Sequence, residues 1–381
     1  MLFIFVSKSC FNSIIAKTMS DRRDFLKTGA VAAASLLAGP TLLNSCSGQK
    51  YENRLLLPDD SIESTLIVPK AMGLPITATF LDEISHDIPH QNWGEKEWDL
   101  DFRYMKAMGI DTVVGIRCGY KKFLTYPSPH LLKKGCYMPS VDLIDMFCRL
   151  AEKYDMKFWF GLYDTGVKYP DGAAEDIENN KYVIDEVWER YGSKYSSFGG
   201  WYLSKEFSRK RKGMIEAYRE LGKQCKEVSG NLPTFISPYI NGKKAVSAFK
   251  NTLSKTTDSS VEEHARDWDE IFDGIHDFVD ICAFQDGHVE YDELDAFLTV
   301  NKQLADKYGM KVWTNSESFD RDMPIKFLPI KFDKLRMKLE SAARCGYEKA
   351  ITFEFSHFMS PQSVYPAAGN LYNRYMEYFD R

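Results

Sequence analysis

The chain has 381 residues, a length that suits one large α/β barrel or two ordinary domains. Its hydrophobic content of 44%, with 14% aromatic residues, is ample for a core and argues against a disordered chain. The formal net charge of −5 disfavours nucleic acid as a partner, because phosphate binding requires a concentrated basic surface.

The N-terminal segment has the features of an export signal. The stretch RRDFLK (22–27) matches the twin-arginine pattern, and residues 29–43 form an apolar run too short and too rich in Ala and Gly for a membrane span. The stretch LNSC (43–46) resembles a lipobox, so we expect Cys46 to be lipidated and to become the new N-terminus. A second methionine, Met19, lies just before the twin-arginine segment, so we interpret residues 1–18 as the result of a start codon assigned too far upstream. The alternative is a stray apolar helix with a chance cysteine.

This interpretation predicts three parts: a signal over 1–45, a polar linker over 46–72 and a folded domain over 73–381. Without residues 1–45, which hold five Lys or Arg and two Asp, the chain keeps 44 basic and 52 acidic residues, a net charge of −8. We expect a periplasmic protein whose only membrane contact is its lipid anchor. Ser47, in place of Asp after the lipidated cysteine, favours the outer membrane.

Eight apolar, β-branched or aromatic runs follow the linker, and they predict eight strands. The runs cover residues 75–82, 111–118, 157–164, 198–206, 233–240, 280–287, 311–319 and 349–357. Helices are predicted between them from apolar residues at three- and four-residue spacing. The predicted helices cover residues 95–109, 140–156, 180–192, 214–230, 264–280, 292–310 and 333–346.

Strands that alternate with helices pair in parallel through right-handed crossovers. Eight such repeats in one chain predict a single (β/α)₈ TIM barrel. A glycine just past a helix, as at Gly109 and Gly309, turns the chain directly into the next strand. An open doubly wound sheet is the alternative, but no glycine-rich phosphate loop follows the first run.

Carboxylates stand at the carboxyl ends of six predicted strands, where barrel enzymes place their chemistry. They are Asp82, Asp164, Glu206, Asp286, Glu317 and Glu354. Alternation puts Trp313, Asn315 and Glu317 on one strand face. In the last run it predicts Glu354 facing the barrel interior and Phe353 facing the outer helices.

Two carboxylates that face each other across a pocket are what glycoside hydrolysis needs, one protonated and one ionised. Six acidic groups at one rim repel one another, so some need cationic partners, for which Lys205 and Arg117 are candidates. The hypothesis also requires that neither catalytic carboxylate be neutralised by Lys205 or by an arginine.

The strand-end glutamates resemble those of the large clan of retaining barrel glycosidases, which carry one at the fourth strand and one at the seventh. That resemblance implies Glu206 as acid/base and Glu317 as nucleophile, although Lys205 stands where the clan usually has Asn. Four wider segments, GGWYLSKEF, CAFQDG, VWTNSESF and ITFEFSHFMSP, resemble the glycosidase-like lipoprotein barrels catalogued as domain of unknown function 4434. This second resemblance covers nearly the whole mature chain and implies a sugar-directed barrel with no settled reaction.

Other rim residues are candidates for binding a carbohydrate substrate, since aromatic rings stack on pyranose faces and polar groups bind hydroxyls. The candidates are Asp82, Trp93, Tyr120, Asp164, Tyr239, Asp286, Asn315, Glu354 and His357. For each aromatic residue, ordinary core packing is the competing interpretation. The six cysteines after Cys46 show no metal-ligand spacing and are predicted to be mostly free thiols.

Two alternative functions stay open. The first is a divalent metal site, as in barrel sugar isomerases of the xylose isomerase type, whose ligands would come from Asp286, His288, Glu354, His357 and the two glutamates. A barrel that binds glycans without catalysis is the second alternative, to which Lys205 in place of Asn points. Two-carboxylate hydrolysis itself requires no metal or other cofactor.

Overall fold

The computed structural model describes residues 71–85, 88–244, 258–321 and 327–381. The predicted signal, Cys46 and the linker up to residue 70 lie outside the described residues, so these interpretations stay predictions. The described residues belong to one compact unit, Pro69–Arg381.

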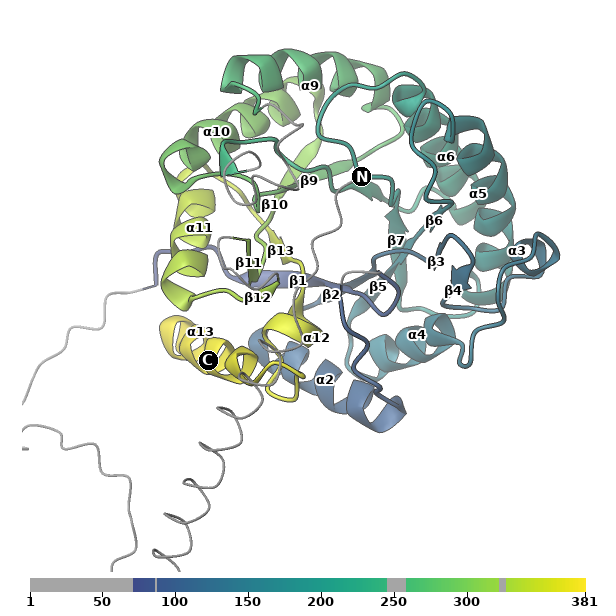
Figure 1. Cartoon of the computed structure of the whole chain (residues 1–381), viewed down its shortest axis with the longest axis horizontal. Helices are drawn as coiled ribbons and strands as arrows, with labels where there is room; N and C mark the ends of the chain where they lie inside the picture. The colour runs from purple at the N-terminus through teal and green to yellow at the C-terminus, as the bar shows by residue number, and fades with distance from the viewer. Residues whose placement is uncertain (1–70, 86–87, 245–257, 322–326) are drawn as a thin grey trace, which may run out of the picture. The chain divides into compact units, whose positions relative to one another are not determined.

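Eight parallel strands close into a barrel in the order β1-β13-β10-β9-β8-β7-β5-β2 (Figure 1). They are β1 (Ile76–Leu81), β2 (Thr112–Gly115), β5 (Lys157–Gly161), β7 (Phe198–Tyr202), β8 (Thr234–Ile236), β9 (Ile281–Gln285), β10 (Lys311–Asn315) and β13 (Ala350–Thr352). Between β9 and β10 the register pairs Gln285 with Asn315, which brings two amide side chains to adjacent strand ends. Each predicted run supplies one strand, so the single (β/α)₈ barrel is confirmed.

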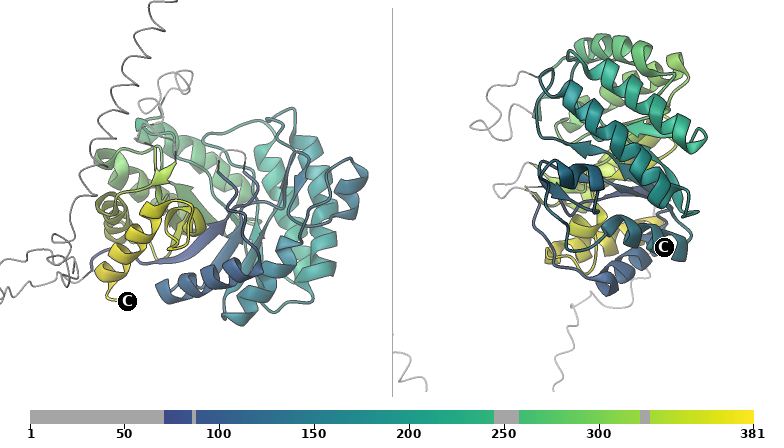
Figure 2. Two further views of the ribbon diagram at one scale, coloured as in Figure 1. Left: turned by 60° about the horizontal axis from the view of Figure 1, so that its bottom comes forward. Right: turned by 90° about the vertical axis from the view of Figure 1, so that its right-hand side faces the viewer.

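Helices surround the barrel (Figure 2). The long ones are α2 (Glu95–Met108), α4 (Leu143–Lys153), α5 (Ala173–Val187), α6 (Met214–Ser229), α9 (Val261–Ile275), α10 (Tyr291–Tyr308), α11 (Phe332–Arg344) and α13 (Pro366–Phe379). Gly109 and Gly309 end α2 and α10 with φ of 93° and 67°, the left-handed conformation that glycine adopts without a Cβ clash.

The start of α5 was predicted wrongly: the helix begins at Ala173, not at residue 180. The first half of the helix carries buried polar side chains in place of an apolar stripe, and these side chains bind the segment Tyr163 to Thr165 that follows β5. Asn180 Nδ2 donates to the Tyr163 carbonyl at 2.9 Å, and Asp176 Oδ1 accepts from Thr165 Oγ1 at 2.6 Å. The helix continues directly into a π-helical turn, η2 (Trp188–Gly192).

Four consecutive basic residues, 209–212, precede α6, which begins at Met214. This run lies in the loop before α6 and pairs with acidic residues of α9. Arg209 Nε lies 2.8 Å from Asp267 Oδ2, and Lys210 pairs with Glu270. These local partners account for two of the four positive charges.

Large side chains fill the interior of the barrel. Phe80, Trp159, Tyr202, Phe235 and Trp313 form one buried cluster there. The rings of Tyr202 and Phe235 stack at 4.6 Å, and those of Trp159 and Trp313 lie 5.8 Å apart. The interior is therefore a packed core, and polar chemistry is confined to its carboxyl end.

A second, larger core lies between strands and helices, and it contains Trp201. The predicted free thiols are confirmed for the described cysteines, which are Cys118, Cys136, Cys148, Cys225, Cys282 and Cys345. Within the described ranges, no helix combines the length and hydropathy that a membrane crossing demands.

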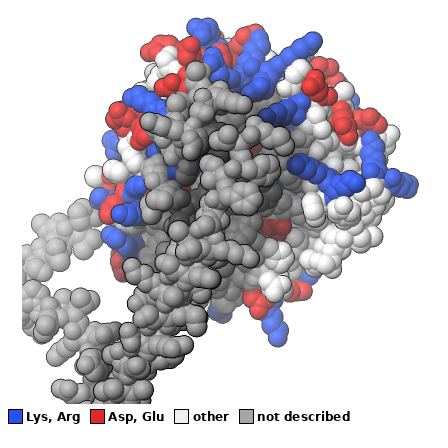
Figure 3. Space-filling model, viewed as in Figure 1, with Lys and Arg blue, Asp and Glu red and all other residues white. Residues whose placement is uncertain are grey.

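Short elements follow the strands at the carboxyl end of the barrel. They are the sheet of β3 (Gly119–Tyr120), β4 (Phe123–Leu124) and β6 (Tyr163–Asp164), the hairpin of β11 (Phe319–Asp320) and β12 (Leu328–Pro329), and α12 (Phe355–Phe358). On the face seen in Figure 3, acidic and basic side chains are interspersed around the periphery. The catalytic candidates lie among these short elements.

Candidate active site

A pocket of about 140 Å³ lies at the carboxyl ends of the strands. Its polar lining comes mainly from Arg117, Glu206, Gln285, Asn315, Glu317 and Arg321. Its apolar lining includes five rings, those of Phe80, Phe319, Phe327, Phe353 and Phe358. Both predicted catalytic carboxylates thus line the same pocket, together with a wall of five phenylalanines.

Glu206 follows β7 and is only partly buried. Tyr202 Oη donates a hydrogen bond to Glu206 Oε1 at 3.0 Å, which orients the carboxyl group. Burial raises the pKa of Glu206, and it outweighs the lowering by the positive charge of Arg117 and by hydrogen bonds from Gln285 and Tyr202. Glu206 therefore keeps its proton to higher pH than an ordinary glutamic acid.

Glu317 lies just beyond β10 and is 2% exposed. Arg321 binds it in a bidentate ion pair, with Nε 2.9 Å from Oε2 and Nη2 2.9 Å from Oε1. Burial alone would raise the pKa of Glu317, but the charge and hydrogen bonds of Arg321, with the charge of Lys338, lower it. The two carboxylates are therefore shifted in opposite directions.

A buried ion pair between Lys338 and Asp286 holds the main chain of Glu317 in place. Lys338 Nζ lies 2.8 Å from Asp286 Oδ1 and donates to the Glu317 carbonyl at 3.1 Å. The same Asp286 oxygen accepts from the Glu317 N–H at 3.1 Å. Lys338 belongs to α11, so a side chain from a helix outside the barrel positions the end of β10. Asp286, predicted to bind substrate, instead serves as this internal partner.

Lys205 neutralises the rim at Asp164, whereas the positive charge of Arg117 acts first on Glu206 and then on Asp82 and Asp164. Lys205 Nζ lies 2.7 Å from Asp164 Oδ1 and 3.3 Å from Asp176 Oδ2. Arg117 Nη1 lies 3.8 Å from Asp164 Oδ2. Lys205 is thus committed to other carboxylates and leaves Glu206 to the pocket, whereas the requirement that no arginine bind Glu317 is not met.

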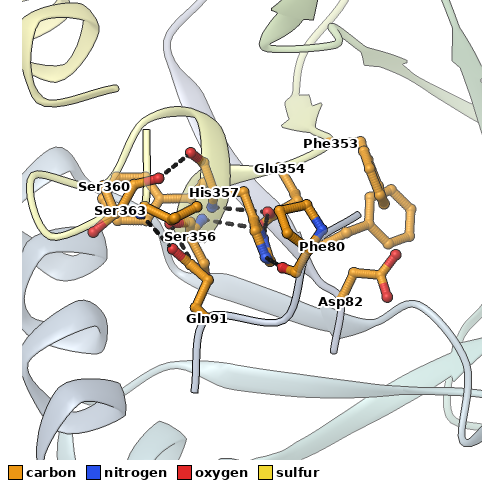
Figure 4. A network of polar contacts seen from close by, with 12 residues as sticks. Phe80, Asp82, Gln91, Phe353, Glu354, Ser356, His357, Ser360 and Ser363 are labelled. Carbon is orange, nitrogen blue, oxygen red and sulfur yellow. Dashed lines mark hydrogen bonds and ion pairs between the residues drawn. The ribbon is translucent and has the colours of Figure 1, made fainter. Parts of the chain in front are cut away.

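Glu354 and His357 do not line the pocket, contrary to the prediction. Figure 4 shows the two side chains within a network of polar contacts. Both are buried, and the Glu354 carboxylate caps α12 by accepting from the N–H groups of Ser356 and His357. It also pairs with His357 Nδ1, while His357 Nε2 lies 2.8 Å from the Pro89 carbonyl. Burial opposes a charge on His357, but Glu354 raises the pKa of the imidazole to about 9. The pair is a structural support beneath the rim.

The orientation predicted for the last strand is therefore inverted at its end. Phe353 lines the pocket and packs against Phe80 and Phe319, at ring distances of 5.9 Å and 6.0 Å. The strand ends at Thr352, so strict alternation no longer applies to the residues that follow. Phe355, by contrast, packs outward in the core against Tyr372.

The remaining predicted substrate contacts divide between the pocket and its surroundings. Asn315 lines the pocket, while Trp93 packs on Trp98 of the core, with ring centroids 5.1 Å apart. Tyr120 lies under Arg117 at 5.4 Å, and Tyr239 packs edge-on to His288 at 5.8 Å. The structure therefore brings Asn315, but not these three aromatic residues, into the pocket lining.

Asp82 also lies outside the pocket lining, although Phe80 and Ser85 on either side of it are part of that lining. Its Oδ1 accepts from the N–H groups of Ile84 and Ser85, both at 2.9 Å, so it fixes the turn after β1. Asp82 thus shapes the rim rather than contacting the pocket.

Sequence reasoning missed Arg321, Gln285 and most of the phenylalanine wall. Arg321 stands four residues after Glu317, a signal that was present but unspecific. Its guanidinium lies over the rings of Phe319 and Phe327, at 4.8 Å and 5.5 Å. This contact links the apolar wall to the ion pair on Glu317.

Several residues of the metal-site alternative are engaged in other ion pairs. Asp286 is bound to Lys338, and Glu354 to His357. Among the residues that the structure describes, no group of three or more His, Cys, Asp or Glu side chains is arranged to hold a metal ion.

Fold and site together define a (β/α)₈ barrel with two carboxylates of opposite pKa shift in one aromatic pocket. The chain belongs to the family described as Domain of unknown function (DUF4434), which matches residues 76–365. No curated protein matches the chain.

Among solved structures, the chain is 70% identical to a Bacteroides thetaiotaomicron protein described as a candidate alpha-L-fucosidase. The match has a TM-score of 0.79 and covers 84% of this chain and 97% of that one. A beta-D-glucuronidase of Dictyoglomus thermophilum is 13% identical, with a TM-score of 0.46 over 80% of this chain and 50% of that chain. The cellulose synthase subunit Z of Clostridioides difficile is 14% identical, with a TM-score of 0.48 over 80% and 100%. The last two are too distant to bear on the reaction.

Proposed function

We propose that this protein is a glycoside hydrolase in which Glu206 is the general acid/base and Glu317 the nucleophile. The observation that carries the proposal is the opposite shift of two carboxylates lining one pocket, which is how one site obtains a proton donor and an ionised partner. The similar Bacteroides protein makes an α-L-fucoside the first substrate to test.

The requirement set from the sequence, that no arginine bind Glu317, was too strict, because an ion pair with Arg321 still leaves Glu317 able to act as a nucleophile. A carboxylate has about four lone-pair positions, and a bidentate arginine occupies two of them. The remaining lone pairs are available for attack, and the positive charge keeps the group ionised. Arg321 also lowers the nucleophilicity of the oxygens, so the same contact favours the second candidate, a barrel that binds glycans without cleaving them.

Hydrolysis of a panel of 4-nitrophenyl glycosides, beginning with the α-L-fucoside, tests the proposal. We expect Glu317→Gln to lose activity on every substrate. Glu206→Gln should lose about 10²–10⁴-fold on glycosides with poor leaving groups but much less on 2,4-dinitrophenyl glycosides, which need no proton. Glu178→Gln, on the exposed face of α5, is the matched control.

Azide distinguishes the two roles. In Glu317→Ala it should attack from the vacated side and give the glycosyl azide of inverted configuration, whereas wild-type hydrolysis should proceed with retention. Wild-type protein that binds the sugar without turnover, with binding unaffected by Glu317→Gln, would overturn the proposal in favour of the glycan-binding barrel. Activity that disappears with a chelator and returns with a divalent cation would overturn it in favour of the metal-dependent isomerase.

We also propose that the protein is exported by the twin-arginine route and held by a lipid on Cys46 in the periplasm, at the outer membrane. The stretches RRDFLK and LNSC support this proposal. Labelling of cells with radioactive palmitate tests it: the wild type should be labelled and fractionate with the outer membrane, and Cys46→Ala should not. Export that persists after Arg22 and Arg23 are both changed to Lys would contradict the route.

A further inference from the structure

The amide oxygen of Asn315 is a buried acceptor in the pocket that lacks a hydrogen-bond donor. Asn315 is the last residue of β10, is 1% exposed and lines the pocket. Its Oδ1 accepts no hydrogen bond from any residue that the structure describes. A buried polar atom left unsatisfied costs about 1–3 kcal/mol, so such an atom beside a binding pocket points to a ligand group that completes it.

The orientation of this amide is fixed by Ser237, which follows β8. Ser237 Oγ donates its only hydrogen to the Ala283 carbonyl at 2.7 Å. Its oxygen must then accept in the contact with Asn315 Nδ2 at 3.0 Å, so the NH₂ group faces Ser237. The carbonyl oxygen of Asn315 is therefore held on the other side.

The neighbouring amide is anchored by the same serine. Gln285 Nε2 donates to the Ser237 carbonyl at 2.7 Å, and Gln285 pairs with Asn315 across the β9–β10 ladder. Arg117, also in the pocket lining, has a buried Nε without an acceptor among the described residues. The pocket thus offers one unsatisfied acceptor and one unsatisfied donor.

A hydroxyl group satisfies both kinds of atom, because it donates one hydrogen bond and accepts others. A carboxylate or phosphate of a ligand would satisfy Arg117 but has no proton to give Asn315. The acceptor at Asn315 therefore selects a ligand group that donates a hydrogen bond, which in a sugar without nitrogen substituents is a hydroxyl.

We propose that Asn315 Oδ1 accepts a hydrogen bond from a free ring hydroxyl of the sugar bound beside Glu317. The proposal rests on the proposed function and deepens it: the substrates are glycosides unsubstituted at that hydroxyl, and methylation or acetylation there prevents binding. Asn315 lies two residues before Glu317, so the bond forms next to the reacting carbon and strengthens with the developing charge. Ser237 is a positioning residue for the amide.

The test compares each glycoside with its monodeoxy analogues. The full-length protein is assayed with the 4-nitrophenyl glycoside that it cleaves fastest, and with the analogues that lack one ring hydroxyl each. In the wild type, one deoxy analogue should lose about 10–100-fold in kcat/KM beyond the difference in intrinsic reactivity. In Asn315→Ala this selectivity should disappear for that one hydroxyl, while the selectivity at the other ring positions stays as in the wild type. If every deoxy analogue keeps its wild-type selectivity in Asn315→Ala, the proposal is overturned.

Ser237→Ala provides an independent variant, which also serves if Asn315→Ala does not fold. This variant frees the Asn315 amide to rotate, so the selectivity against the same deoxy analogue should fall. Unchanged selectivity against that analogue would contradict the positioning role of Ser237. Failure of the proposed function is distinguishable, because no glycoside would then be turned over by the wild type. In that case calorimetric titration with L-fucose and its monodeoxy analogues applies the same criterion to binding.

Discussion

Lys338 Nζ lies 2.8 Å from Asp286 Oδ1 in a fully enclosed contact between α11 and the end of β9, with 4% and 2% of the two side chains exposed. Through their hydrogen bonds to the N–H and C=O of Glu317, the two charges determine where the proposed nucleophile stands. A charge on an outer helix is thus part of the support of the site.

Lys338→Met leaves Asp286 as an unpaired buried carboxylate. Removing one partner of a buried ion pair costs about 3–5 kcal/mol of unfolding free energy. The main chain of Glu317 loses a donor as well, and a small displacement there should lower kcat by about 100-fold with KM nearly unchanged. Urea unfolding and steady-state kinetics measure the two effects.

The double variant Lys338→Met with Asp286→Asn is the control. It removes both charges, so most of the lost stability should return. The value of kcat should stay low, because the Glu317 carbonyl still lacks the hydrogen bond from Lys338. A double variant that recovered full kcat would show that Lys338 has no role in positioning Glu317.

Gly287→Ala is expected to disable the site without disrupting the barrel. A Cβ at this position would overlap the carboxylate of Glu317 and lie 2.6 Å from Arg321 Nε. The carboxylate must move, so we expect kcat to fall by about 100-fold or more, with an unchanged far-ultraviolet spectrum.

Gly369→Ala is the matched control, because a Cβ there meets its nearest atom, Pro361 Cα, at an ordinary 3.5 Å. Gly369 lies within α13, so alanine should raise stability by up to about 1 kcal/mol and leave the kinetics unchanged. Equal activity of the two variants would contradict the assignment of Glu317.

Arg321→Met should move the acid limb of the pH profile of kcat/KM to higher pH. The proposed mechanism requires ionised Glu317, and Arg321 lowers the pKa of that group, so its removal should raise the pH at which activity appears. In the proposed mechanism the alkaline limb reports loss of the proton from Glu206. The pKa of Glu206 is governed by its burial and by Arg117, Gln285 and Tyr202, so this limb should stay in place.

Arg149→Met, which breaks only exposed pairs with Glu95 and Asp145, is the control and should leave both limbs where they are. An acid limb that did not move in Arg321→Met would mean that another group controls it.

The fold was predictable because strand periodicity and helix caps are local signals. Runs such as 311–319 carry an apolar start and a polar end, which is what a barrel strand opening at its carboxyl end requires. The same logic placed Glu206 and Glu317 at the rim, and both line the pocket.

Residues beyond the strand ends were not predictable in the same way. Glu354 follows the end of β13 and caps α12, so alternation no longer governed its side chain. Lys338 sits in an amphipathic helix where nothing in the local pattern marks a lysine that points inward. Such contacts depend on tertiary packing between segments far apart in the sequence, for which a single chain gives no local signal.

His264 makes the stability of the barrel sensitive to acid. It is 2% exposed among Trp268, Phe284 and Phe297, and Nε2 lies 2.7 Å from Asn301 Oδ1. Burial lowers the pKa of His264 from 6.5 to about 4. The unfolded chain therefore takes up this proton near pH 6.5, whereas the folded chain resists it until about pH 4, so stability is lost as the pH falls between these values.

The shift corresponds to about 3 kcal/mol, since one pKa unit equals about 1.4 kcal/mol. His264→Gln keeps a donor for Asn301 but does not titrate. Between about pH 7.5 and pH 4 both proteins should lose unfolding free energy, and the loss in the variant should be about 3 kcal/mol smaller than in the wild type. His276→Gln, at a partly exposed position, should follow the wild type. Urea unfolding at the two pH values measures the difference, and parallel losses in wild type and His264→Gln would show that the acid sensitivity arises from other groups.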